Sequence, residues 1–221
     1  MARLTVAAAI CLAVGSLIVA PQWVLASPAK PTRPCARGYA YGGLASREGV
    51  RGVAAAISAA RTPAVASGHA AAWVGVGGVR EGRGGTSAWL QTGLAAFGGR
   101  GLRLYVEEVS PGQPRRFLDL GGASLGRRYR VAVVETATDV WQASIDGRPV
   151  GKPAYLPTGG GSWRGVATAE SWAAGRGSCN SFSYRFDHID VFGDSGWSRL
   201  NAAQLVGRGV SRDDSGFSAR A

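Results

Sequence analysis

Residues 70–111, AAAWVGVGGVREGRGGTSAWLQTGLAAFGGRGLRLYVEEVSP, decide the fold of this chain. They read as three consecutive β-strands joined by glycine-rich turns, at residues 71–76, 88–93 and 102–109. No apolar pattern of helical length lies between them. In the second strand, alternation places Trp89, Gln91 and Gly93 on one face. A glutamine between a tryptophan and a glycine is a poor core element, so this face is better suited to the floor of a groove.

Strand patterns also fill the rest of the chain. With 34 Gly and 10 Pro among 221 residues, long helices are disfavoured and short strands with turns are favoured. Residues 50–60 fit either a strand or a short helix, and the nearby glycine and proline breaks favour a strand. The other expected strands are at residues 38–44, 128–135, 140–145, from Val150 onward, 163–172 and 181–192, with a loop and edge strand in 113–126. We therefore predict an all-β fold in which two antiparallel sheets pack as a β-sandwich.

The N-terminus predicts export. Arg3 precedes the apolar run 4–20, and residues 24–26 resemble a small-residue cleavage site. We expect residues 1–26 to be a cleaved signal peptide, with an uncleaved anchor as the alternative. The mature chain would then be secreted, with no membrane contact. The expected parts that follow are a proline-rich lead at 27–37, the sandwich at 38–193 and a poorly ordered polar tail at 194–221.

Cysteine usage agrees with export, because loss of the signal peptide would leave one pair, Cys35 and Cys179. An even pair in a secreted chain predicts a disulfide. The two histidines, His69 and His188, show no zinc-ligand spacing with these cysteines and are expected to be structural. We therefore expect no metal and no cofactor.

The net charge of +11 and the pI of about 10.6 predict a strongly positive surface. The Lys and Arg residues are scattered rather than clustered on one stripe, so we expect no nucleic-acid partner. An anionic polymer of the cell envelope is a possible partner for such a surface.

Three carboxylates fall on apolar or aromatic strand faces. Glu108 shares a face with Leu102, Leu104 and Val106, and Glu135 and Glu170 occupy comparable positions in their own strands. Such a group either ends a strand in water or lies in a lined groove. For Glu135 we favour a position at the strand end, and for Glu108 we favour neither interpretation over the other. For Glu170 we favour the groove because of its aromatic neighbours.

Several segments occur in an order that resembles the eqolisin, or glutamic peptidase, family. The segments are AWVGVGG at 72–78, WLQTG at 89–93, YVEEVSP at 105–111, a V-x-V strand at 131–133 and TAESW at 168–172. The resemblance implies a secreted β-sandwich of the concanavalin-type jelly-roll class, with a catalytic glutamine and glutamate on the concave sheet. Gln91 matches the glutamine, and Glu170 matches a glutamate of the last segment. The implied chemistry is water activation by the glutamate, with the glutamine amide stabilising the oxyanion.

The sequence departs from the family pattern at two points. The family's aspartate after W-V-G-I falls on Gly77, and a second glutamate in the last segment falls on Ala173 or Ala174. A non-catalytic module that binds carbohydrate or cell wall in the same groove therefore stays open as an alternative. In either case the ligand would be a peptide or a polysaccharide, and the residues expected to contact it are Trp89, Tyr105, Glu108 and Trp172.

Overall fold

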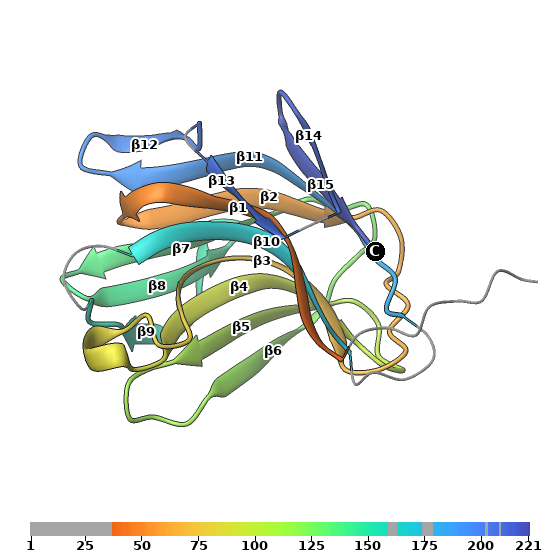
Figure 1. Ribbon diagram of the computed structural model, residues 1–221, viewed down its shortest axis with the longest axis horizontal. Coiled ribbons are helices and arrows are strands. Elements are labelled where there is room, and N and C mark those ends of the chain that lie inside the picture. The colour runs from red at the N-terminus through yellow and green to blue at the C-terminus, as the bar shows by residue number, and fades with distance from the viewer. Residues whose placement is uncertain (1–36, 159–162, 174–178, 202, 208) are drawn as a thin grey trace, which may run out of the picture. The chain divides into compact units, whose positions relative to one another are not determined.

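The computed structural model describes residues 37–158, 163–173, 179–201, 203–207 and 209–221. Two antiparallel sheets contain almost all of them (Figure 1). The seven-stranded sheet has the order β13 (Ala203–Gly207), β1 (Gly38–Val50), β10 (Trp163–Ala173), β3 (His69–Gly78), β4 (Ala88–Phe97), β5 (Arg103–Val109), β6 (Arg116–Gly122). One short 3-10 turn, Arg83–Gly85, lies between β3 and β4.

The second sheet has eight strands. Its order is β14 (Val210–Asp213), β15 (Gly216–Arg220), β11 (Ser183–Gly193), β2 (Gly52–Ala59), β7 (Tyr129–Ala137), β8 (Val140–Ile145), β9 (Arg148–Tyr155), with β12 (Gly196–Arg199) also paired to β11. The predicted β-sandwich is confirmed, and so is the strand interpretation of residues 50–60.

The core lies between the two sheets and follows the alternation of each strand. From the seven-stranded sheet, Val74 and Leu90 are fully buried in it. From the other sheet come Val131 and Trp141, and the predicted core face of residues 182–186 is buried as well. A second, smaller apolar cluster covers the opposite face of the seven-stranded sheet, which we call the outer face; it consists of Ala71, Trp73, Ala95 and Tyr105. Part of the outer face of the first sheet is therefore buried as well.

Gly75 lets two neighbouring strands of the first sheet lie close at the outer face. It is paired with Gln91 across β3 and β4. A Cβ atom at position 75 would lie 2.8 Å from the Gln91 Cβ and 2.7 Å from the Leu90 carbonyl oxygen. Any larger residue would displace Gln91, so glycine at this position sets where the glutamine side chain begins.

The prediction of a poorly ordered polar tail at 194–221 is wrong. This segment contains four strands, and the β14–β15 hairpin extends the second sheet through pairing of β15 with β11. Phe217 is fully buried and its ring stacks on that of Phe186, with the centroids 4.4 Å apart. Phe217 and Ala219, at alternate positions of β15, therefore anchor a segment whose average composition is polar.

The expected signal peptide and Cys35 lie outside the described residues, so the export signal and the disulfide with Cys179 stay predictions. Within the described part of the chain, no helix is long and apolar enough to cross a membrane.

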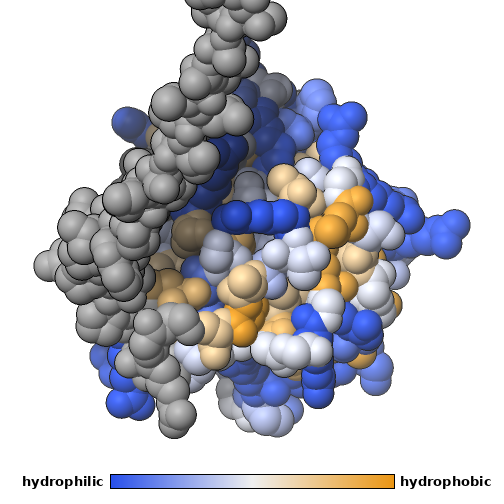
Figure 2. Space-filling model, turned by 90° about the vertical axis from the view of Figure 1, so that its right-hand side faces the viewer, coloured by the Kyte–Doolittle hydropathy of each residue, from blue (hydrophilic) through white to orange (hydrophobic). Residues whose placement is uncertain are grey.

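Large hydrophobic side chains are exposed at separate places on the surface. Figure 2 shows one face on which such side chains lie among hydrophilic ones. Scattered apolar residues of this kind are ordinary on protein surfaces. The exposed set includes Tyr39, Tyr41, Val79, Phe117, Leu118, Leu125, Tyr155 and Trp197. Among these residues, Tyr39 and Tyr41 stack on each other on one face of β1. Both also line a cavity on the outer face of the first sheet.

Candidate active site

Glu170 lies on the outer face of β10, between β1 and β3. Its register partners are Tyr41 on one side and Ala71 on the other. The residue is only 7 % exposed, and both of its carboxylate oxygens are hydrogen-bonded. Oε1 lies 2.7 Å from Nε2 of His69, and Oε2 accepts a hydrogen bond of 3.1 Å from Nε1 of Trp73. The buried carboxylate is therefore fixed in one orientation by two different side chains of β3.

Gln91 lies on the same outer face, two strands away on β4. Its register partners are Gly75 and Glu107, and it is 8 % exposed. Its amide nitrogen Nε2 donates a hydrogen bond of 3.2 Å to the hydroxyl of Tyr105. A primary amide carries two N–H groups, so one donor is left for another acceptor.

Gln91 and Glu170 meet at a small hollow. Both line a cavity in which the space available to the centre of a water molecule is about 10 Å³. One water molecule needs roughly 10–15 Å³ of such space. The hollow also contacts His69 and Tyr105, which are the hydrogen-bond partners of the two residues. The hollow is therefore at the lower limit of size for one water molecule, and both an acid and an amide line it.

A larger groove of about 320 Å³ adjoins these two side chains on the outer face. Aromatic rings form much of its wall, and they come from β1, β3 and β4: Tyr39, Tyr41, Trp73 and Trp89. Burial, and then the nearby carboxylate of Glu170, raise the pKa of the Tyr41 hydroxyl well above its ordinary value. That hydroxyl therefore stays protonated, and Tyr41 is uncharged where it borders the groove.

Glu107, and not Glu108, is the carboxylate that β5 contributes to the groove. Glu107 is 6 % exposed; its Oε1 accepts from Trp89 Nε1 at 3.1 Å, and its Oε2 lies 2.8 Å from Arg115 Nη2. Glu108 points to the other face, where it bonds Ser110. The alternation predicted for Glu108 is correct, but the face it shares with Val106 is the inner one, so the assignment of Glu108 to the ligand site is wrong.

Tyr105 and Trp172 do not have the ligand-stacking positions expected of them. Tyr105 is 1 % exposed beneath the ring of Phe117, and it supports Gln91 from below. Burial raises the pKa of its hydroxyl well above the ordinary value. Trp172 stacks on the imidazole of His69, with centroids 6.5 Å apart, and is not among the residues that line the groove. Of the expected contact residues, only Trp89 borders the groove.

The sequence interpretation did not place His69, which was expected to be structural, beside Glu170. The imidazole is 101 residues away from Glu170 in the chain, and only the pairing of β3 with β10 brings the two together. For Tyr39 and Tyr41, which line the groove, the sequence does contain a signal, because alternation places both side chains on one face of the first strand.

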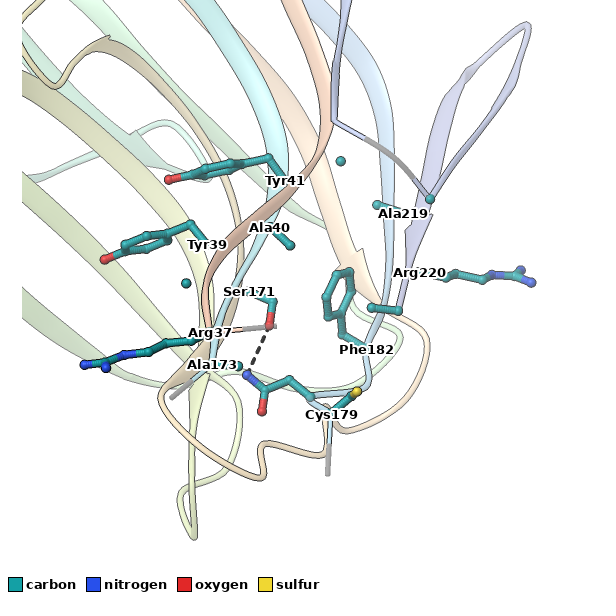
Figure 3. Close-up of a pocket in the computed structure, with 15 residues that line it drawn as sticks. Arg37, Tyr39, Ala40, Tyr41, Ser171, Ala173, Cys179, Phe182, Ala219 and Arg220 are labelled. Carbon is teal, nitrogen blue, oxygen red and sulfur yellow. Dashed lines mark hydrogen bonds between the residues drawn. The ribbon is translucent and has the colours of Figure 1, made fainter. Parts of the chain in front are cut away.

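A second cavity, of about 420 Å³, lies on the other side of β1 (Figure 3). Figure 3 shows that the rings of Tyr39 and Tyr41 project away from Phe182 and Ala219 in its wall. Among the described residues no Asp, Glu or His side chain lines this cavity. The outer groove, which has two buried carboxylates, is therefore the better candidate for chemistry.

Comparison with known proteins identifies the fold. A scan against protein-family models found no match, and no curated protein matched the sequence. Solved structures do match, among them scytalido-glutamic peptidase with a peptide based transition state analog, at 19 % identity and a TM-score of 0.60 over 84 % of this chain and 98 % of that one. The fold is that of the glutamic peptidases. SCP-B, a member of the eqolisin family of peptidases in a complex with the tripeptide Ala-Ile-His, shares this glutamic-peptidase fold at 16 % identity, with a TM-score of 0.53 over 84 % of this chain and 98 % of that one.

Proposed function

We propose that this chain is a secreted peptidase that hydrolyses peptide bonds with Glu170 as general base and Gln91 as its assistant. The observation that carries the proposal is the water-sized hollow lined by both side chains. The glutamic-peptidase fold supports it, because the segments of the sequence that resemble that family include the ones that carry Gln91 and Glu170.

The proposed reaction starts with a water molecule held in the hollow. Each carboxylate oxygen of Glu170 accepts one hydrogen bond from protein and has a further lone pair with which it can take a proton from the water. The oxygen of that water then attacks the carbonyl carbon of the substrate. The second N–H of Gln91 donates to the developing oxyanion, and Glu170 returns its proton to the departing amine nitrogen.

The groove supplies the place for the substrate. A peptide chain lying along the aromatic wall would bring one carbonyl carbon over the hollow. The buried Glu107 is paired with Arg115 at the same wall, so it does not present an unpaired charge to the substrate.

The test is digestion of an unfolded protein substrate across acid pH by the wild-type chain and three variants. Glu170→Gln removes the base, and we expect kcat to fall at least about a hundredfold. Gln91→Ala removes the oxyanion donor, and we expect a loss of about a hundred- to a thousandfold. Glu108→Gln is the matched control, because it changes the same functional group on the inner face beside the site and should leave activity unchanged.

Two results contradict the proposal. One is a wild-type chain that cuts no substrate at any pH between about 2 and 7 while folded. The other is Glu170→Gln with wild-type activity. Loss of activity in Glu108→Gln equal to that in Glu170→Gln would show that the effect is not specific to the groove.

A carbohydrate-binding or cell-wall-binding module is the second candidate, favoured by the aromatic wall of the groove. Tyrosine and tryptophan rings stack on sugars as well as on peptides. Retention of the Glu170→Gln variant on insoluble polysaccharide, with loss of retention in Trp89→Ala, would support this candidate. Retention that disappears as salt rises, and that is unchanged in Trp89→Ala, would instead indicate adhesion of the +11 chain to an anionic polymer.

A further inference from the structure

His69 is the first residue of β3 and the partner of Glu170 across the sheet. Its Nε2 lies 2.7 Å from Glu170 Oε1, and the two side chains are only 16 % and 9 % exposed. Gln91, by contrast, is bonded to Tyr105. The acid and the amide at the hollow therefore have separate supports, one on β3 and one on β5.

Aromatic rings hold the His69 imidazole on three sides. Tyr39 approaches it at 6.0 Å with an interplanar angle of 61°, Phe97 lies at 6.0 Å and 54°, and Trp172 stacks on it at 6.5 Å and 18°. These residues come from β1, β4 and β10. These three rings restrict the directions in which the imidazole can turn away from Glu170.

The backbone of His69 is anchored as well. Its carbonyl oxygen accepts a hydrogen bond of 3.1 Å from Nδ2 of Asn180, which is 4 % exposed. The same amide group also donates to the carbonyl oxygen of Trp172 at 2.9 Å. The residues that hold the imidazole are therefore tied to each other.

The carboxylate of Glu170 gains a fixed plane from this arrangement. The indole N–H of Trp73 can only donate, so it holds Oε2 as an acceptor. A second donor on Oε1 prevents rotation about the last side-chain bond. With the carboxylate held at both oxygens, its free lone pairs point in constant directions.

We infer that His69 is the positioning residue of Glu170: it donates its Nε2–H to Oε1, and the general base of this chain is a His69–Glu170 pair. The inference rests on the proposed function for its catalytic consequence. The contact itself does not depend on that function, and the test below separates the two.

The first arm measures kinetics on an unfolded protein substrate. His69→Ala removes the donor, and we expect kcat to fall about ten- to a hundredfold with KM within about twofold of wild type. His69→Gln keeps an N–H at a similar reach and should recover most of that loss. His188→Asn is the matched control: it changes the other histidine, at an exposed position with φ of 50° that asparagine tolerates, and should leave kcat unchanged.

The second arm needs no activity. The chain has two histidines, so its imidazole N–H signals in a proton NMR spectrum are few. We expect a downfield Nε2–H signal, slow to exchange with water, that persists in His188→Asn and disappears in Glu170→Gln and His69→Ala.

The outcomes separate the inference from the proposed function. If the wild-type chain cuts nothing but the signal is present and depends on Glu170, the peptidase proposal fails and the His69–Glu170 pair stands. If the signal is absent from the folded wild-type chain, the inference is overturned whatever the activity. It is also overturned if folded His69→Ala keeps wild-type kcat, or if folded His69→Gln is as slow as His69→Ala.

Discussion

Gly77 occupies the position at which the glutamic peptidase family, which the sequence resembles, has an aspartate. We expect the substitution Gly77→Asp to destabilise the fold of this chain. The backbone at Gly77 has φ of 81°, in the left-handed region that favours glycine. A Cβ atom at this position would lie 2.1 Å from the carbonyl oxygen of Ala88 on the neighbouring strand. Neither feature depends on the identity of the side chain beyond Cβ.

The magnitude follows from two contributions. The positive φ costs about 1–2 kcal/mol for a residue with a Cβ. Overlap with a packed strand costs about 1–3 kcal/mol more, since a backbone oxygen cannot rotate away. We therefore expect Gly77→Asp to lower the free energy of unfolding by about 2–5 kcal/mol, a large part of the roughly 5–15 kcal/mol of a typical domain.

Urea unfolding followed by tryptophan fluorescence is a suitable measurement. Gly84→Asp is the matched control, because φ there is 66° and no atom lies within 4 Å of the Cβ position. This control isolates the conformational contribution, which we expect to be about 1–2 kcal/mol. Equal losses in the two variants, or a Gly77→Asp midpoint at the wild-type value, would refute the reasoning from the Ala88 contact.

Two further predictions concern the C-terminal hairpin. Phe217→Ala should lower the free energy of unfolding by about 3–5 kcal/mol, because the ring is fully buried against Phe186; thermal unfolding measures it, and a loss below about 1 kcal/mol would contradict the packing. The hydrogen bonds from Arg185 and from Ser215 hold the pKa of the Asp213 carboxyl well below its usual range. A depressed carboxyl pKa gives stability that is present above its unfolded value of about 3.9 and is lost as pH falls below it. Asp213→Asn should therefore flatten the acid side of a plot of melting temperature against pH, and an unchanged slope below about pH 4 would argue against this pair.

Most of the architecture could be predicted from local pattern, because alternation and glycine breaks report where strands begin and which side chains share a face. The β4 strand shows this, with Leu90 in the core and Gln91 on the outer face. In the last segment, the polar average composition hid the alternation of Phe217 and Ala219, which is the signal from which a buried face could have been predicted.

The site itself was only partly predictable, since it depends on which strands become neighbours. Glu170 and Gln91 do lie on one face of one sheet, but the partner of Glu170 is set by the insertion of β10 between β1 and β3. Nothing local to His69 reports that pairing. In β5 the two adjacent acids point to opposite faces, so the choice between Glu107 and Glu108 required knowing which face is closed by the second sheet.

Asn180 has a consequence for how the loop before β3 can change. Its side-chain oxygen accepts hydrogen bonds from the backbone nitrogens of Ala66 and Ser67, while its nitrogen bonds the carbonyl oxygens of His69 and Trp172. One amide thus sets the spacing between the end of this loop and the strand carrying the imidazole. Residues added at the exposed Arg61 or Thr62, before the pairing of Ala64 with Ser181, should leave the His69–Glu170 contact unchanged. A single residue added between Ala66 and His69 should shift the imidazole out of line with Glu170. We therefore expect changes of length to be accepted at the start of this loop and not at its end.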